Sequence, residues 1–268
     1  MFRTVLILTG LIASLRADEV CTGEAFKPSC PKGEVIVVQS ASLGVPHVGR
    51  CPQVDIGVVG CSVDVLSFMD YRCSGRPSCQ VSLPDDQMDA SGCPPDAKDF
   101  LLVEYQCTSV QTREIADCGE DVQPQELVGA KGAISSYKEA RNQLYGQQGK
   151  CHWRVQSPKG TNIAFSILDF GTAATKMNFT EPLCHYVMTI TDVKSGRKAT
   201  VTCGGMERSR EVIQTGSEAE IVRILKHTTH LSPEYLVTYT VTDESNGVEV
   251  VLGSWKLLMF VFLFAIGH

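Results

Sequence analysis

The twelve cysteines carry the most reactive side chains of this 268-residue chain. They run from Cys21 to Cys203, eight of them up to Cys107 and four from Cys118 onward. A cysteine can act as a nucleophile, bind a metal ion or pair as a disulfide, and an even number in an exported chain favours disulfides. Complete pairing leaves no thiolate for nucleophilic catalysis. We therefore expect a protein held together by disulfides.

Other catalytic patterns are missing from the sequence. It contains no His-Glu-x-x-His zinc motif and no Gly-x-Ser-x-Gly nucleophile elbow. His227 and His230 form the one close histidine pair, and in an extended segment their rings would point to opposite faces. Such a pair is a poor zinc site. We predict that the protein is not an enzyme and needs no cofactor or metal.

The first residues resemble a secretory signal. An apolar run over residues 5–13 follows the single positive charge of Arg3 and precedes small residues. The run is too short to span a bilayer. We predict a signal peptide over residues 1–17, cleaved after Ala17 or, because Leu15 is bulky for the position two before this bond, a few residues away from it.

The C-terminal end predicts attachment to a membrane. The apolar run over residues 257–266 is shorter than the roughly 20 residues of a membrane span, and no basic residue follows it. Ser245-Asn246-Gly247 supplies three small residues upstream, as in signals for a glycosylphosphatidylinositol anchor. We predict such a signal over residues 243–268 with Asn246 as the attachment site. Ser245 and Gly247 are alternative attachment sites, and a transmembrane segment starting near Val248 is the other interpretation.

The net charge bears on the kind of partner, and one glycosylation motif fits an exported protein. The formal net charge of −6 argues against nucleic acid as a partner, since phosphate binding depends on clustered Lys and Arg. Asn178-Phe179-Thr180 is an acceptor sequence for an N-linked glycan, which predicts a surface loop there.

The first cysteine-rich segment has the pattern of a small domain that mixes strands and helix. Apolar runs at residues 34–40 and 100–106 predict strands, and residues 64–71 predict a short helix capped by Asp64. A domain of this size needs covalent cross-links. Eight cysteines allow 105 pairings, and spacing alone does not choose among them.

The order of motifs in this segment adds a resemblance. The motifs are Cys21-Thr22-Gly23-Glu24, Cys30, Cys51, Cys61, Cys73-Ser74-Gly75-Arg76-Pro77-Ser78-Cys79, Cys93 and Val103-Glu104-Tyr105-Gln106-Cys107. In this order they resemble the galactose/rhamnose-binding lectin domain of sea-urchin egg lectin, also found in latrophilin receptors. The resemblance implies a compact fold of antiparallel strands and helices over residues 18–108. It also implies the bridges Cys21 to Cys51, Cys30 to Cys107, Cys61 to Cys93 and Cys73 to Cys79.

The sugar-binding positions of that family differ here. Its Tyr-Gly-Arg tripeptide corresponds to Leu43-Gly44-Val45, and its Lys-Tyr-Leu to Asp99-Phe100-Leu101, or to Lys98 with one inserted residue. The acidic residue expected after the first cysteine is Thr22, with Glu24 nearby. Glu24 and Lys98 are therefore the candidate carbohydrate contacts, or simply solvated charges. Because each net hydrogen bond contributes only about 1 kcal/mol, we predict weak or absent binding of rhamnose and galactose.

The second segment predicts an antiparallel β-sandwich. Short β-rich runs separated by polar turns recur at residues 163–170, 186–191, 199–203, 220–225 and 235–241. Alternation in the first run places Ile163, Phe165 and Ile167 on one face, which we expect to pack in the core.

This segment resembles a CUB domain over residues 118–242. Its Cys-x-Trp-x-Val element at Cys151, its Gly-x-Ile-x-Ser opening at Gly132 and its Cys203-Gly204 ending carry the resemblance. The resemblance implies bridges Cys118 to Cys151 and Cys184 to Cys203.

Many CUB domains bind calcium through one Glu and two Asp residues, and calcium needs six or more oxygen ligands. Here Val187 stands where an Asp usually follows the tyrosine, which leaves Glu139, Asp169 and Asp192 as isolated carboxylates. We predict no tight calcium site.

The sequence as a whole thus predicts a mainly β protein with two extracellular domains. Residues 109–117 between them are a short linker or the first edge of the second domain. We predict a non-catalytic recognition protein at the cell surface, or in a secreted form, that binds extracellular or membrane proteins. A functional lectin for galactose- or rhamnose-type glycans is the alternative, and an unrecognised hydrolase comes last.

Overall fold

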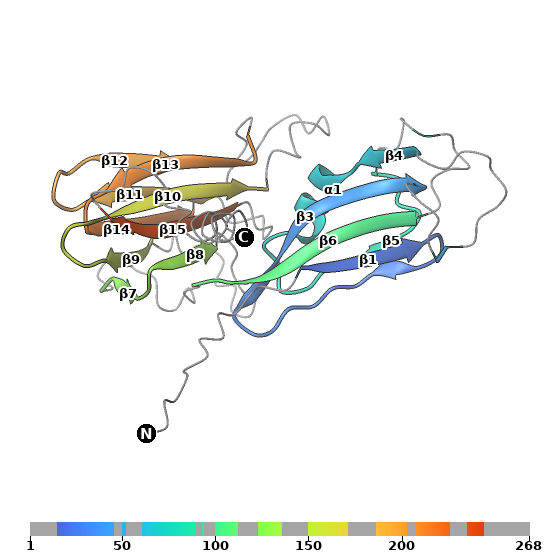
Figure 1. Ribbon diagram of the computed structural model, residues 1–268, viewed down its shortest axis with the longest axis horizontal. Coiled ribbons are helices and arrows are strands. Elements are labelled where there is room, and N and C mark those ends of the chain that lie inside the picture. The colour runs from blue at the N-terminus through green and yellow to red at the C-terminus, as the bar shows by residue number, and fades with distance from the viewer. Residues whose placement is uncertain are drawn as a thin grey trace, which may run out of the picture.

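In the computed structural model the described residues form two β-rich domains, one over residues 16–109 and one over residues 125–243 (Figure 1). It describes residues 15–45, 50–51, 61–88, 93, 100–111, 123–135, 150–170, 186–202, 207–225 and 235–243. Over these ranges the protein is mainly β, with antiparallel sheets and one helix, which confirms the predicted fold class. Within them, no helix is both long and apolar enough to cross a bilayer.

The first domain is built on one four-stranded antiparallel sheet in the order β1-β6-β3-β4. The helix α1 packs on β3, and β2 of a small two-stranded sheet, β2-β5, contacts β1. The elements are β1 (Arg16–Cys21), β2 (Ala25–Phe26), β3 (Glu34–Val45), β4 (Cys61–Asp64), α1 (Leu66–Cys73), β5 (Val81–Ser82) and β6 (Phe100–Ser109).

The predicted helix begins later than its sequence pattern indicates. Val65 is the N-cap and makes no side-chain capping bond, whereas Asp64 is the last residue of β4. The Asp64 carboxylate still accepts a hydrogen bond from the backbone N–H of Leu66, at 2.8 Å. Phe68 and Met69 of the helix are buried in the domain core. The capping role of Asp64 is thus displaced by one residue, because β4 pairing holds Asp64 extended.

Four disulfides cross-link this domain. They join Cys21 to Cys51, Cys30 to Cys107, Cys61 to Cys93 and Cys73 to Cys79. These are the pairs that the lectin resemblance implies. Cys21 is the last residue of β1 and Cys107 lies within β6, so two of the bridges fix these strands to Cys51 and Cys30 outside the sheet.

The second domain is a sandwich of two sheets. One sheet has the order β13-β10-β15-β8 and the other β12-β11-β14-β9-β7. Among the described pairs of strands in these sheets only β7–β9 is parallel, and Gln111 adds an isolated parallel bridge to Ile134 of β8. The strands are β7 (Gln125–Leu127), β8 (Lys131–Ser135), β9 (Lys150–Gln156), β10 (Thr161–Asp169), β11 (Tyr186–Asp192), β12 (Lys198–Val201), β13 (Ser209–Thr215), β14 (Glu218–Leu225) and β15 (Tyr235–Asp243).

The core of the sandwich matches the alternation in the sequence. Ile163, Phe165 and Ile167 are at most 1% exposed and face Trp153 of the opposite sheet within one apolar cluster. Strand β13 was not predicted, because Ser209, Arg210 and Glu211 begin it with polar residues. It lies at a sheet edge, where outward side chains meet water.

The junction between the domains is part of both. Strand β6 extends through Ser109. Of the next two residues, Val110 hydrogen-bonds to the first domain and Gln111 to the second. Strand β1 begins at Arg16, so cleavage after Ala17 would keep Asp18–Cys21 of it. Cys151 is disulfide-bonded. Several residues named from the sequence lie outside the described residues: Lys98, Cys118, Glu139, Asn178, Cys184, Cys203, His227, His230 and Asn246.

Candidate functional site

A tight turn after β1 positions Glu24, the carbohydrate candidate. The N–H of Glu24 donates to the carbonyl of Cys21 at 2.9 Å, and Gly23 takes a positive φ of 87° that suits glycine. The Gly23 N–H bonds to the carbonyl of Leu83 and fixes the turn to the loop after β5. The Glu24 carboxylate folds back and accepts a hydrogen bond from the Cys21 N–H at 3.0 Å.

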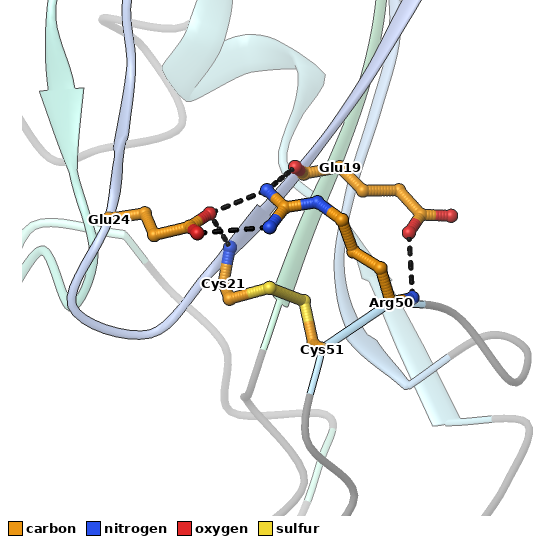
Figure 2. The surroundings of a disulfide bond; sticks show 5 residues. All are labelled: Glu19, Cys21, Glu24, Arg50 and Cys51. Atoms are coloured by element: carbon orange, nitrogen blue, oxygen red, sulfur yellow. Dashed lines mark hydrogen bonds and ion pairs between the residues drawn. A yellow bond between two sulfur atoms is a disulfide. The ribbon is translucent and has the colours of Figure 1, made fainter.

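A disulfide brings an arginine to this carboxylate (Figure 2). Because Cys51 is bonded to Cys21, the preceding residue, Arg50, lies beside the turn. Its guanidinium donates one N–H to each oxygen of Glu24, and the Nη1–Oε1 distance is 2.9 Å. Arg50 also donates to Glu19, from its side chain to the carbonyl and from its backbone N–H to the carboxylate. The guanidinium is thus bound to β1 and to the turn together.

The pairing changes the acidity of Glu24. Its pKa is lowered from 4.5 to about 2, first by the hydrogen bonds from Arg50 and then by the Cys21 N–H. The pKa of Arg50 is raised for the complementary reason. Glu24 is therefore a carboxylate at every physiological pH, with its charge already compensated. A two-point pair of this kind fixes both side chains more firmly than a single contact would.

The pair forms one wall of a polar pocket of about 600 Å³. Its other walls come from β1, from Ala25–Lys27 after the turn, and from Leu102 of β6. Carboxylate and guanidinium groups beside a small apolar surface can hydrogen-bond a polar ligand such as a sugar. In this pocket, however, the ligand would meet groups that already bond to one another.

The tripeptide position of the family lies in the sheet and not in this pocket. Leu43 is 5% exposed and belongs to the core of the first domain. Gly44 has a φ of 144°, and a Cβ there would come within 2.3 Å of the Cys61 carbonyl oxygen. Val45 ends strand β3. The aromatic and guanidinium groups of the family tripeptide are therefore replaced by a core leucine and a strand terminus. Lys98, the other candidate, lies outside the described residues.

Two of the three carboxylates considered for calcium, Asp169 and Asp192, have other roles, and the third, Glu139, lies outside the described residues. Asp192 accepts hydrogen bonds from the Ser195 hydroxyl at 2.7 Å and from the Lys194 N–H at 3.1 Å, which closes the turn after β11. These and further bonds lower its pKa. Asp169 is fully buried and pairs with Arg210 at 3.1 Å. Among the residues the structure describes, no group of three or more potential ligands gathers around one point.

Sequence reasoning found Glu24 and missed Arg50 and Glu19. The signal for Arg50 was present, because it precedes the cysteine whose bridge returns the chain to Cys21, three residues before Glu24. Glu19 carried no such signal, since it is one of several acidic residues near the N-terminus.

Removing the Arg50 side chain is expected to restore an ordinary acidity to Glu24. In the wild-type protein, titration of the Glu24 carboxyl carbon by NMR should give a midpoint near 2, and in Arg50→Ala it should rise towards 4.5. The stabilisation from the pair should be complete above about pH 4.5 and disappear as the pH falls towards 2. Lys27→Ala is the matched control, because Lys27 lines the same pocket and should leave the midpoint unchanged. A wild-type midpoint near 4.5 would contradict the pairing.

The first domain is thus a disulfide-linked lectin-type domain with a polar pocket beside its first bridge. The sequence profile of the D-galactoside/L-rhamnose binding SUEL lectin domain matches residues 28–107. A D-galactoside-specific lectin of Heliocidaris crassispina is 30% identical over 102 residues, which cover 35% of this chain and 91% of that lectin. The chain therefore belongs to the SUEL lectin family.

Two solved structures are similar to the chain at a low level. The CUB1-EGF-CUB2 region of human MASP-1/3 aligns with a TM-score of 0.30 at 9% identity and covers 85% of this chain and 99% of that one. A Penaeus vannamei nodavirus structure aligns with a TM-score of 0.22 at 8% identity, over 79% of this chain and 82% of that one.

Proposed function

We propose that this chain is a non-catalytic recognition protein of the cell surface that binds extracellular or membrane proteins through its two domains. The observation that carries the proposal is the Glu24–Arg50 pair in the polar pocket of the first domain. A sugar hydroxyl that bonds to Glu24 must compete with a guanidinium that already holds both carboxylate oxygens. Each hydroxyl gains only about 1 kcal/mol net, so several free partners are needed at once.

The missing tripeptide groups support the same conclusion. With Leu43 packed in the core, no aromatic ring at that position is available to cover the apolar face of a sugar. A protein partner does not depend on one pocket, because a specific interface spreads over about 800 Å² on each side. Two adjacent domains supply such an area more readily than one polar pocket does.

The remaining parts of the proposal rest on sequence patterns. Residues 118–242 would be a CUB domain without bound calcium, Asn178 would carry a glycan, and a lipid attached at Asn246 would hold the protein on the membrane. A β-sandwich that buries Trp153 is compatible with the first of these.

Binding of galactose- or rhamnose-type glycans is the second candidate function. The description of the matched family and the name of the sea-urchin relative favour it, as does a pocket that exposes both Glu24 and Arg50. A ligand that displaced Arg50 from Glu24 would find a free carboxylate beside a free guanidinium.

Capture from intact cells is expected to recover a protein partner that free sugar does not elute. Cells that express the chain would be cross-linked and treated with phosphatidylinositol-specific phospholipase, which should release the protein if a glycosylphosphatidylinositol anchor is present. The released complexes would be captured, divided, and eluted with galactose or rhamnose or with denaturant. Recovery of no specific partner contradicts the proposal. Elution by either sugar supports the lectin function instead.

A further inference from the structure

Strand β3 is buried on both of its faces in its first half. Ile36 and Val38 point into the core of the first domain. Val35 and Val37, on the opposite face, are 3% and 2% exposed and belong to a different apolar cluster. A strand with one face in water would alternate between apolar and polar residues. The unbroken run of four apolar residues therefore marks a second surface that β3 covers.

That second surface belongs to the other domain. Besides Val110, the cluster around Val35 and Val37 contains three residues of the second domain: Ala133 of β8, Leu236 of β15 and Phe170, which follows β10. Each of these three is at most 4% exposed. An apolar contact buried to this degree resembles a domain core, whereas contacts between independently moving domains are usually more polar.

The backbone crosses the same boundary with two successive hydrogen bonds. The Val110 N–H donates to the Gly33 carbonyl of the first domain at 3.0 Å. The next N–H, of Gln111, donates to the Ala133 carbonyl of the second domain at 2.7 Å, and Gln111 pairs in parallel with Ile134. Figure 1 shows β6 running from its own sheet towards β8. Val110 and Gln111 are thus each held by a backbone hydrogen bond, one to each domain.

Arg208 of the second domain reaches into the first. Its carbonyl accepts a hydrogen bond from the Asp169 N–H at 2.6 Å, which fixes its backbone beside β10. Its guanidinium donates to both oxygens of Asp70 in α1, at 2.6 and 2.9 Å, and to the carbonyl of Val38. Ser74 closes the network, because its hydroxyl donates to Asp70 and accepts from the Val38 N–H.

The burial of Asp70 makes this contact costly to lose. The Asp70 side chain is 1% exposed, and Arg208 supplies the opposite charge. A buried carboxylate whose partner is removed keeps its desolvation cost without the compensating attraction. Separation of the domains would in addition expose the apolar cluster to water.

We propose that the two domains form one rigid recognition unit, locked by Arg208 of the second domain inserted between α1 and β3 of the first. Arg208 is a positioning residue in this arrangement. Its contacts fix the angle between the domains, so that the surfaces of both reach a partner in one geometry. This inference concerns the coupling of the domains and holds whether the partner is a protein or a glycan.

Amide hydrogen exchange in the full chain tests the lock. In Arg208→Ala, the Val110 and Gln111 amides, whose bonds cross the boundary, should exchange about tenfold faster or more. The amides of β10 and of α1 away from the lock should keep their protection, which shows that both domains are folded. Asp70→Asn removes the negative charge of the Arg208–Asp70 pair with little change of shape. The Val110 and Gln111 amides should exchange faster in this variant too.

Arg210→Ala is the matched control. Arg210 lies two residues from Arg208 and carries the same charge, but it donates hydrogen bonds to Asp169, Glu207 and Thr202, which all belong to the second domain. The Val110 and Gln111 amides should therefore exchange as in the wild type. The proposal is overturned if Arg208→Ala and Asp70→Asn leave these amides unchanged, or if Arg210→Ala accelerates them equally.

Discussion

Replacement of both Cys30 and Cys107 by alanine is expected to lower the free energy of unfolding of the first domain by about 4.5 kcal/mol. The bridge closes a loop with a sequence separation of 77, and the entropy that a cross-link removes from the unfolded chain grows with the logarithm of loop length. A domain of this size has a total stability of roughly 5–15 kcal/mol, so the loss is a large part of it. Urea unfolding of the full chain, followed by a probe in the first domain, measures the change.

The Cys73–Cys79 bridge supplies the control for this prediction. Its sequence separation is 6, for which the same relation gives about 2 kcal/mol. Cys73 is fully buried, whereas Cys30 and Cys107 are only half-buried, so a loss dominated by packing would make the shorter bridge the more important one. A larger loss for the Cys73→Ala and Cys79→Ala pair would contradict the explanation by chain entropy.

Gly44→Ala is expected to destabilise the first domain by about 3 kcal/mol, the upper end for one strained residue. The φ of 144° is unfavourable for alanine, and the added Cβ would come within 2.3 Å of the Cys61 carbonyl oxygen and 2.9 Å of the Ser62 Cα. Both neighbours are backbone atoms of β4, so relief requires that β3 and β4 separate. Thermal and denaturant unfolding would show the loss.

Gly33→Ala separates the cost of the backbone conformation from the cost of the contact between the added Cβ and β4. Gly33 has a φ of 82°, and a Cβ there would meet nothing within 4 Å, so this variant experiences only the backbone strain. It should cost about 1 kcal/mol. Equal losses at Gly33 and Gly44 would mean that the close approach of β4 to Gly44 has no energetic weight.

The sequence predicted the parts of the fold whose signals are local. Alternation placed Ile163, Phe165 and Ile167 in the core, and the motif order of the first segment implied its four bridges. Each of these signals is complete within a single strand or a single family pattern.

The features that the sequence did not predict depend on contacts between distant segments. The apolar run at Val35–Val38 indicated a strand, but not that a second domain covers its outer face. Arg208 is one basic residue in a polar stretch, and only the folded chain brings it to Asp70, 138 positions away. Arg50 reaches Glu24 through a disulfide in the same way. The spacing of residues along the chain does not indicate any of these contacts.

The lectin resemblance predicted only part of the site, because the contact between Arg50 and Glu24 also joins distant segments. The resemblance named the positions of the missing sugar contacts, Leu43 and Val45, but not the group that holds Glu24. The structure adds that Arg50 holds this carboxylate and that Leu43 is a core residue. A family member can therefore keep the disulfide framework of a lectin while two charged groups that line its pocket bond to each other.

The fraction of captured partner that free galactose or rhamnose elutes is the most direct test of the central claim. With Glu24 held by Arg50 and the tripeptide groups missing, neither sugar should elute more than buffer does, and denaturant should release a protein. Specific elution by either sugar would contradict the claim and would show that the pocket opens to a glycan.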